Sequence, residues 1–176
     1  HKNAAIIEGS KSFAKDLMHQ YNIATAIYAV FEASAKAIVY IKEQGAPIVV
    51  KADGLALGKG VTVAMTEEDA INAVKDAMDG GAFGSAGARV VIEEFLTGPE
   101  VSVLAFTDGK TIKTMPSAQD HKRAYDHDKG PNTGGMGAFS PSRMYTDEIA
   151  KTCMDTIFRP TIDAMAKEGR TFKGVI

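Results

Sequence analysis

Residues 47–63 read P-I-V-V-K-A-D-G-L-A-L-G-K-G-V-T-V. Val and Ile are enriched in strands, so residues 48–50 and 61–63 predict the two arms of a hairpin. The loop between them holds Gly54, Gly58 and Gly60, and it carries the cations Lys51 and Lys59. Because glycine lets backbone N–H groups approach phosphate oxygens closely, the stretch predicts a phosphate-covering loop. A glycine-rich surface turn with solvated lysines is the alternative.

Two better-known glycine loops do not fit this stretch. A Walker A loop has four residues between its glycines and a Ser or Thr after its lysine. Here three residues separate Gly54 from Gly58, and Gly60 follows Lys59. A dinucleotide-binding glycine motif opens a helix, whereas residues 61–64 read as a strand.

Composition is that of an ordinary globular protein. The 176 residues are 45% hydrophobic and 24% charged, with a net charge of −2, so there is no basic excess that would indicate a nucleic-acid partner. Cys153 is the single cysteine, which excludes an internal disulfide and favours a reducing, cytoplasmic compartment. No apolar run has the length of a membrane span, and no signal peptide is visible.

The ends of the chain predict a piece of a longer protein. The sequence starts at His1 without a methionine and stops at F-K-G-V-I, residues 172–176, which read as the beginning of a strand. We therefore expect part of the active site to lie outside these residues.

The first half predicts a helix followed by a small lobe. Ser10 is a candidate N-cap for a helix over residues 10–21, and Lys11 in its first turn suggests a negative neighbour, although a solvated lysine is the alternative. Strands are then expected at 26–31, 47–50, 61–64 and 89–93, with helices at 33–44 and 66–79. This β-α-β-β-α-β order indicates helices on one face of a sheet.

The second half predicts a hairpin, a long loop and a kinked helix. Residues 101–106 and 111–115 read as strands, and residues 117–142 have little apolar periodicity, which is typical of a functional loop. His121 and His127 lack helical metal-ligand spacing, so no zinc site is predicted. A helix over 146–167 is expected to kink at Pro160, with Cys153 on its apolar face as a core residue.

Four stretches together resemble the ATP-grasp superfamily, and within it the phosphoribosylamine–glycine ligase family. They are E-G-S-K at 8–11, I-V-V-K-A-D-G-L-A-L-G-K-G at 48–60, E-E-F-L-T-G-P-E at 93–100, and Q-D-H-K-R at 119–123 with G-P-N-T-G-G-M-G at 130–137. The resemblance covers nearly the whole chain in the family's order. It implies an α/β (α+β) ATP-grasp fold, with 30–94 as the small lid lobe and 1–29 with 95–176 as an incomplete large lobe.

The resemblance also implies the ATP-binding residues. Lys11 and Lys51 are expected at the phosphates or the adenine edge, and the loop carrying Lys59 at the β- and γ-phosphates. The full set of expected ATP contacts is Lys11, Lys51, Gly54, Gly58, Lys59, Gly60, Glu93, Glu94, Phe95, Leu96 and Glu100, with residues 93–96 at adenine and Glu100 at the ribose.

By the same resemblance, the substrates are ATP, glycine and 5-phosphoribosylamine, joined through glycyl phosphate with Mg²⁺ or Mn²⁺. Expected near glycine and the acyl phosphate are Asp120, Lys122, Arg123, Asn132, Thr133, Gly134 and Gly135. Lys51, Lys59, Asp120 and Arg123 are the expected catalytic residues. The metal ligands are expected downstream of Ile176, and the absent flanking domains imply that this chain alone is inactive.

Three alternatives stay open on the sequence. The chain could belong to another ATP-grasp carboxylate–amine ligase or carboxylase, although such enzymes are not expected to carry both Q-D-H-K-R and G-P-N-T-G-G-M-G. It could be a nucleotide-sensing module without chemistry. It could also be a structural domain that binds nothing.

Overall fold

The computed structural model describes residues 2–56, 60–121, 123–126 and 129–176. These residues form two compact units, Lys2–Thr97 and Gly98–Ile176, and each is described by itself. The grouping of residues 1–29 with 95–176 in one larger lobe stays a prediction. In the described part of the chain, no helix has both the length and the apolar character needed to cross a membrane.

The first unit consists of a four-stranded antiparallel sheet and its helices. In chain order its elements are α1 (Ile6–Gly9), α2 (Lys11–Gln20), β1 (Tyr28–Phe31), α3 (Ser34–Gln44), β2 (Ile48–Ala52), β3 (Val61–Ala64), α4 (Glu67–Met78), the 3₁₀ helix η1 (Gly84–Gly87) and β4 (Val90–Glu94). The strands lie in the order β1-β4-β2-β3. The predicted β-α-β-β-α-β order is therefore confirmed.

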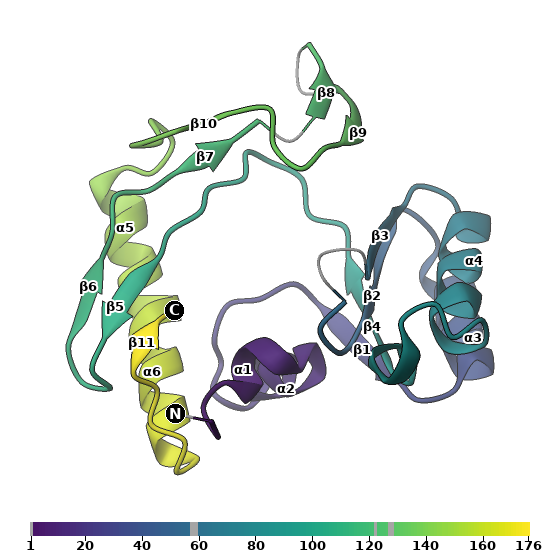
Figure 1. Cartoon of the computed structure of the whole chain (residues 1–176), viewed down its shortest axis with the longest axis horizontal. Coiled ribbons are helices and arrows are strands. Elements are labelled where there is room, and N and C mark those ends of the chain that lie inside the picture. The colour runs from purple at the N-terminus through teal and green to yellow at the C-terminus, as the bar shows by residue number, and fades with distance from the viewer. Residues whose placement is uncertain (1, 57–59, 122, 127–128) are drawn as a thin grey trace. The chain divides into compact units, whose positions relative to one another are not determined.

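One face of this sheet is covered by α3 and α4, with α2 on the other side (Figure 1). The core between the sheet and the two helices is apolar and is built by alternate strand residues and by the inner helix faces. It contains Ile48, Val50, Val90 and Ile92 from the strands and Ala37, Ile41, Ala70 and Val74 from the helices. Since successive strand residues point to opposite faces, the residues between these strand positions point away from α3 and α4.

Helix caps in the first unit follow the sequence signals. The hydroxyl of Ser10 accepts a hydrogen bond from the amide of Phe13, and that of Thr66 accepts one from the amide of Asp69. Gly45 ends α3 with a φ of 78°, a backbone conformation that glycine adopts without a steric penalty.

The second unit combines short antiparallel ladders with a broken helix. Its elements are β5 (Ala105–Thr107), β6 (Ile112–Thr114), β7 (Gln119–Asp120), β8 (Arg123–Tyr125), β9 (Lys129–Asn132), β10 (Ala138–Phe139), α5 (Asp147–Cys153), the π-helical turn η2 (Met154–Phe158), α6 (Arg159–Lys167) and β11 (Gly174–Val175). The sheet β11-β5-β6 packs on the helix through Ala105, Ile112, Phe158 and Ile162. Cys153 packs against this core, as predicted.

Two sequence-based expectations in the second unit are corrected by the structure, and a third is met in a particular form. The strand predicted over 101–106 is short: only residues from Ala105 onward pair as β5, and Ser102 makes an isolated bridge to Ala118. The segment 117–142 is not structureless, because β7 pairs with β10 and β8 with β9. The interruption expected at Pro160 is a π-helical turn, η2, which ends just before α6. Pro160 lies in the first turn of α6, where the missing N–H of proline is tolerated.

Candidate functional site

The sheet face that points away from α3 and α4 carries the polar residues of interest in the first unit. The strand register places four residues side by side in each of two rows on this face. One row is Tyr28, Glu93, Val49 and Val63; the next is Val30, Val91, Lys51 and Val61. At the β3 edge, Val61 and Val63 are 44% and 42% exposed, so this end of the face is an accessible apolar surface beside Lys51.

Glu93 is a buried carboxylate held between two lysines. Its Oε2 lies 2.9 Å from Nζ of Lys15, and its Oε1 lies 2.9 Å from Nζ of Lys51. Nζ of Lys51 lies at ion-pair distance from Oε1 of Glu93, but the two groups are not oriented for a hydrogen bond. Within the described residues, Oε1 is therefore a buried acceptor without a hydrogen bond. The attraction between opposite charges in a poorly solvated place does not need that angle, and we therefore treat the contact as an ion pair.

The two lysines differ in how much of their charge remains accessible. Lys15 also donates to Oγ1 of Thr25 at 2.7 Å and lies 5.8 Å from the ring centre of Tyr28. Its side chain is 11% exposed, against 26% for that of Lys51. The cluster of Lys15, Lys51 and Glu93 carries a net positive charge, and Lys51 is the member that can offer that charge to an anion.

Tyr28 closes the cluster on the β1 side. Its hydroxyl donates to Oδ1 of Asp16 at 2.8 Å. Burial, followed by the hydrogen bond to Asp16 and the charge of that carboxylate, raises the pKa of Tyr28 from 10.0 to about 12. The phenol therefore stays protonated at neutral pH and acts here as a hydrogen-bond donor.

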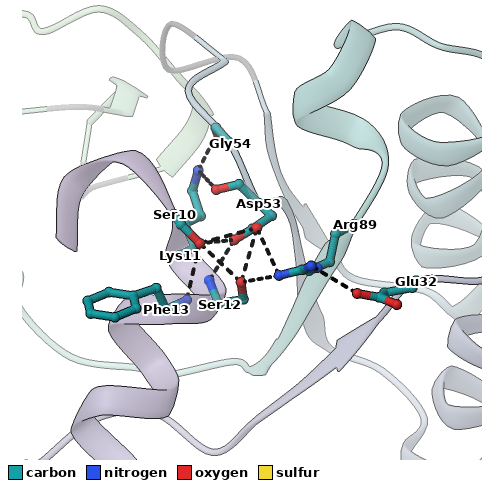
Figure 2. Close-up of polar contacts among 8 residues, drawn as sticks. All are labelled: Ser10, Lys11, Ser12, Phe13, Glu32, Asp53, Gly54 and Arg89. Carbon is teal, nitrogen blue, oxygen red and sulfur yellow. Dashed lines mark hydrogen bonds and ion pairs between the residues drawn. The ribbon is translucent and has the colours of Figure 1, made fainter. Parts of the chain in front are cut away.

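Lys11 extends from the first turn of α2 to the start of the glycine loop (Figure 2). Its ammonium donates to the carbonyl oxygens of Gly54 at 3.0 Å and Asp53 at 3.5 Å. The sequence predicted a negative neighbour for Lys11, and in this structure its partners are two backbone carbonyl oxygens. A contact between Lys11 and ATP stays a prediction.

At two positions of the glycine loop, close neighbours leave no room for a side chain. A Cβ on Gly54 would lie 2.8 Å from Cβ and 2.9 Å from Cα of Ala86, and one on Gly60 would lie 2.6 Å from Cβ of Ala56. Both positions need glycine for packing, whether or not a phosphate binds there. Gly58 and Lys59, which the sequence places at the tip, lie outside the described residues.

The segment 93–96 runs off the end of β4. Glu94 pairs with Ile48 in the last described step of the ladder, and its side chain accepts from the amide of Ile27 at 2.7 Å. The backbone groups of Phe95 and Leu96 follow beyond this ladder, and the Leu96 side chain is 64% exposed. This placement is what an adenine-binding hinge needs, although the contact itself stays a prediction, as does that of Glu100.

The second unit brings two sequence motifs together. Asp120 pairs with Ala138 in the β7-β10 ladder, and His121 exchanges backbone hydrogen bonds of 2.8 Å with Met136 and Gly137. Within the intervening turn, the amide of Gly135 donates to Oγ1 of Thr133 at 3.1 Å. The turn with Gly134 and Gly135 therefore ends beside the strand that carries Asp120.

The remaining predicted substrate contacts are described only in part. Arg123 and Asn132 are backbone partners in the β8-β9 ladder, and Lys122 lies outside the described residues. All substrate contacts, and the catalytic roles assigned to Lys51, Lys59, Asp120 and Arg123, stay predictions.

Three residues of the site were missed by sequence reasoning: Lys15, Asp53 and Arg89. Lys15 pairs with Glu93 across 78 residues of chain, and such long-range pairing leaves no local signal. Asp53 stands inside the motif K-A-D-G, which could have drawn attention to it. Arg89 contacts both Glu32 and Ser12 in Figure 2.

The residues that the structure describes do not form a metal site. Among the described residues there is no group of three or more His, Cys, Asp or Glu side chains that could hold a metal ion. We therefore derive no chemical step through a metal from this chain.

Comparisons with known proteins agree with one another. The model of the family described as phosphoribosylglycinamide synthetase, ATP-grasp (A) domain, matches residues 9–176. The chain is 55% identical over 175 residues to a phosphoribosylamine–glycine ligase of Streptococcus pyogenes, covering 99% of this chain and 42% of the relative. It is 56% identical over 173 residues to the chloroplastic phosphoribosylamine–glycine ligase of Arabidopsis thaliana, covering 98% of this chain and 32% of the relative.

Solved structures give the same picture. The crystal structure of phosphoribosylamine–glycine ligase from Thermotoga maritima matches with a TM-score of 0.88 at 37% identity, over 99% of this chain and 44% of that one. D-alanyl-alanine synthetase A from Vibrio cholerae shares the fold, with a TM-score of 0.65 at 17% identity over 90% of this chain and 49% of that one.

The chain thus spans less than half the length of these relatives. The family model matches far more than half of this chain, and the ATP-grasp fold expected from the sequence is confirmed. The chain belongs to the phosphoribosylglycinamide synthetase ATP-grasp (A) domain family.

Proposed function

We propose that this chain is the ATP-binding part of a longer phosphoribosylamine–glycine ligase. The full-length protein would join glycine to 5-phosphoribosylamine and convert ATP to ADP and phosphate, a step of purine synthesis, in the cytoplasm. The observation that carries the proposal is the accessible cation Lys51 beside the exposed valines of β3, at the foot of a glycine loop. The family match supports ATP as the ligand of this surface.

The chemistry needs ATP because a carboxylate is a poor acyl donor. A carboxylate oxygen of glycine attacks the γ-phosphorus, and the bond to the β-phosphate oxygen breaks to release ADP. The amine of phosphoribosylamine then attacks the acyl carbon of glycyl phosphate, loses a proton and expels phosphate. Such phosphoryl transfer depends on positioning and on neutralising negative charge rather than on a protein nucleophile.

Each part of the site has a place in this proposal. The ammonium of Lys51 neutralises phosphate charge, while Glu93 and Lys15 hold it on the open sheet face. The backbone of Phe95 and Leu96 offers adenine the paired donor and acceptor that its edge requires. We assign the binding of glycine and of the acyl phosphate to Asp120 and the turn at Thr133–Gly135. A divalent cation, Mg²⁺ or Mn²⁺, would be held by residues of the full-length protein outside this chain.

The test is an assay of ADP formation by the full-length protein. We expect turnover that needs both glycine and phosphoribosylamine, with no sustained formation of ADP when either is omitted. ADP formed with another carboxylate in place of glycine would indicate a different ATP-grasp enzyme. ATP binding without any ADP would indicate a nucleotide sensor, and the absence of any ATP-induced rise in melting temperature would indicate a structural domain.

The isolated 176-residue chain provides a second test. We expect it to form no ADP, because the residues that hold the metal and the second substrate lie elsewhere in the full-length protein. Turnover by the isolated chain at the rate of the full-length protein would contradict this proposal.

A further inference from the structure

Asp53 lies inside the glycine-loop motif, yet its carboxylate points to a helix. Oδ1 accepts from the amide of Ser12 at 2.6 Å, and Oδ2 accepts from the hydroxyl of Ser12 at 3.0 Å. The hydroxyl of Ser10 lies 3.2 and 3.3 Å from the two oxygens. These partners form the amino end of α2 (Figure 2), where unpaired N–H groups and the helix dipole favour a negative charge.

Arg89 supports the same carboxylate from the β4 side. Its Nη1 donates to the hydroxyl of Ser12 at 3.0 Å and lies 3.7 Å from Oδ2 of Asp53, while its backbone carbonyl accepts from the amide of Asp53 at 3.0 Å. Nη2 of Arg89 is paired with Glu32 at 2.9 Å. The Asp53 side chain is 14% exposed, so its charge is balanced from two directions and largely shielded from water.

The backbone on either side of Asp53 is tied to the same structures. The amide and the ammonium of Lys11 both donate to the carbonyl of Asp53, and the ammonium reaches that of Gly54 as well. The amide of Gly54 donates to the carbonyl of Ala86 at 3.3 Å. At the other end of the loop, the carbonyl of Gly60 accepts from the amide of Ala52 at 2.8 Å.

We infer that Asp53 is a positioning residue, which fixes the start of the glycine loop to the amino end of α2 and acts on bound nucleotide only through that loop. This inference rests on the proposed function, in which the loop covers the phosphates of ATP. A loop whose stem is held before the ligand arrives loses less conformational entropy on binding. Release of the stem should therefore weaken ATP binding while the chemical step at saturating ATP is retained.

The experiment compares four forms of the full-length protein: the parent, Asp53→Ala, Asp53→Asn and the control Asp79→Asn. Asp79 is exposed at the end of α4 and has no part in the site. Hydrogen exchange is measured at the amides of Ser12 and Gly54, and ATP affinity and kcat are measured on the same samples.

In Asp53→Ala we expect both amides to exchange faster and ATP affinity to fall roughly tenfold, as expected for the loss of a helix cap, with kcat within about twofold of the parent. Asp53→Asn keeps an acceptor for the Ser12 amide, so it should recover part of both effects. Asp79→Asn should match the parent. If Asp53→Ala does not fold, Ser12→Ala, which removes the hydroxyl contacts to Asp53 and Arg89, should show the same two changes at smaller size.

Three results with the Asp53→Ala variant would overturn the inference. Unchanged exchange at Ser12 and Gly54 would show that Asp53 does not hold the stem. Faster exchange with unchanged ATP affinity would reduce Asp53 to a local helix cap. A loss of kcat without a loss of ATP affinity would place Asp53 in the chemistry itself. If the parent binds no ATP, the proposed function fails, and the inference about nucleotide positioning fails with it. The hydrogen-exchange data still decide whether Asp53 holds the start of the glycine loop.

Discussion

Lys51 and Glu93 are diagonal neighbours on adjacent antiparallel strands. The register pairs Lys51 with Val91 and Glu93 with Val49, so the two charged side chains share a face and lie one row apart. Diagonal neighbours of this kind are within reach of a long side chain, and Nζ of Lys51 indeed lies 2.9 Å from Oε1 of Glu93. This contact holds Lys51 on the open face of the sheet. The negative charge of Glu93 is thus balanced by a lysine that is still partly exposed to solvent.

Removal of the Glu93 charge should destabilise the first unit. In Glu93→Gln the ammonium groups of Lys15 and Lys51 lose the carboxylate that lies 2.9 Å from each. Breaking a buried ion pair on one side costs about 3–5 kcal/mol, and we expect a loss of that order in the free energy of unfolding, measured by urea denaturation. The exposed Glu43→Gln in α3 should change it by less than about 0.5 kcal/mol. Equal unfolding free energies for the two variants would contradict this role.

Substitution of Lys51 should weaken nucleotide binding. We expect Lys51→Met in the full-length protein to lower ATP affinity roughly tenfold to a hundredfold, the usual range for the loss of a hydrogen bond to a charged group. Isothermal titration with ATP measures this directly. Lys51→Arg should bind better than Lys51→Met because it keeps the positive charge.

The matched control is Lys42→Met, in the last turn of α3 and on the surface. It should bind ATP as the parent does. If Lys51→Met also binds ATP with the affinity of the parent, Lys51 is not a phosphate ligand.

Gly54 should tolerate no side chain. In Gly54→Ala the new methyl group would lie 2.8 Å from Cβ and 2.9 Å from Cα of Ala86, and the second contact involves backbone that cannot rotate away. We expect a loss of about 1–3 kcal/mol in the free energy of unfolding. Gly9→Ala, where the added Cβ meets nothing within 4 Å, should be neutral or slightly stabilising. If both variants unfold at the same denaturant concentration, the close approach of Gly54 to Ala86 is wrong.

The sequence predicted the first unit well because its signals are local. Alternating Val and Ile, the caps Ser10 and Thr66, and Gly45 each act within a few residues, and each is found where it was expected. The ladders β7-β10 and β8-β9 were missed because each strand is only two to four residues long, too short to show an alternation of polar and apolar residues. The pairing of Lys15 with Glu93 was missed because only the packing of α2 on the sheet brings the two together.

Tyr28 gives the site a pH dependence at the alkaline end. Its pKa is raised from 10.0 to about 12, first by burial and then by the hydrogen bond to Asp16 and the charge of that residue. A group with a raised pKa in the folded state contributes stability that is fully present below its unfolded pKa and is lost as the pH rises through its folded pKa. The contribution of Tyr28 should therefore be intact below pH 10 and disappear between about pH 10 and pH 12.

Tyrosinate absorbance, followed during an alkaline titration, tests this assignment. The chain has five tyrosines, so the Tyr28 transition is identified as the one near pH 12 that is missing in Tyr28→Phe. Asp16→Asn should move that transition toward pH 10 but not all the way, because the amide removes the negative charge and leaves the burial, which is the larger cause. The exposed Asp79→Asn, just after the end of α4, should leave the Tyr28 transition in place. A Tyr28 transition that stays near pH 12 in Asp16→Asn would show that burial alone raises the pKa, and that the hydrogen bond to Asp16 has no part in keeping the phenol protonated beside Lys15 and Glu93.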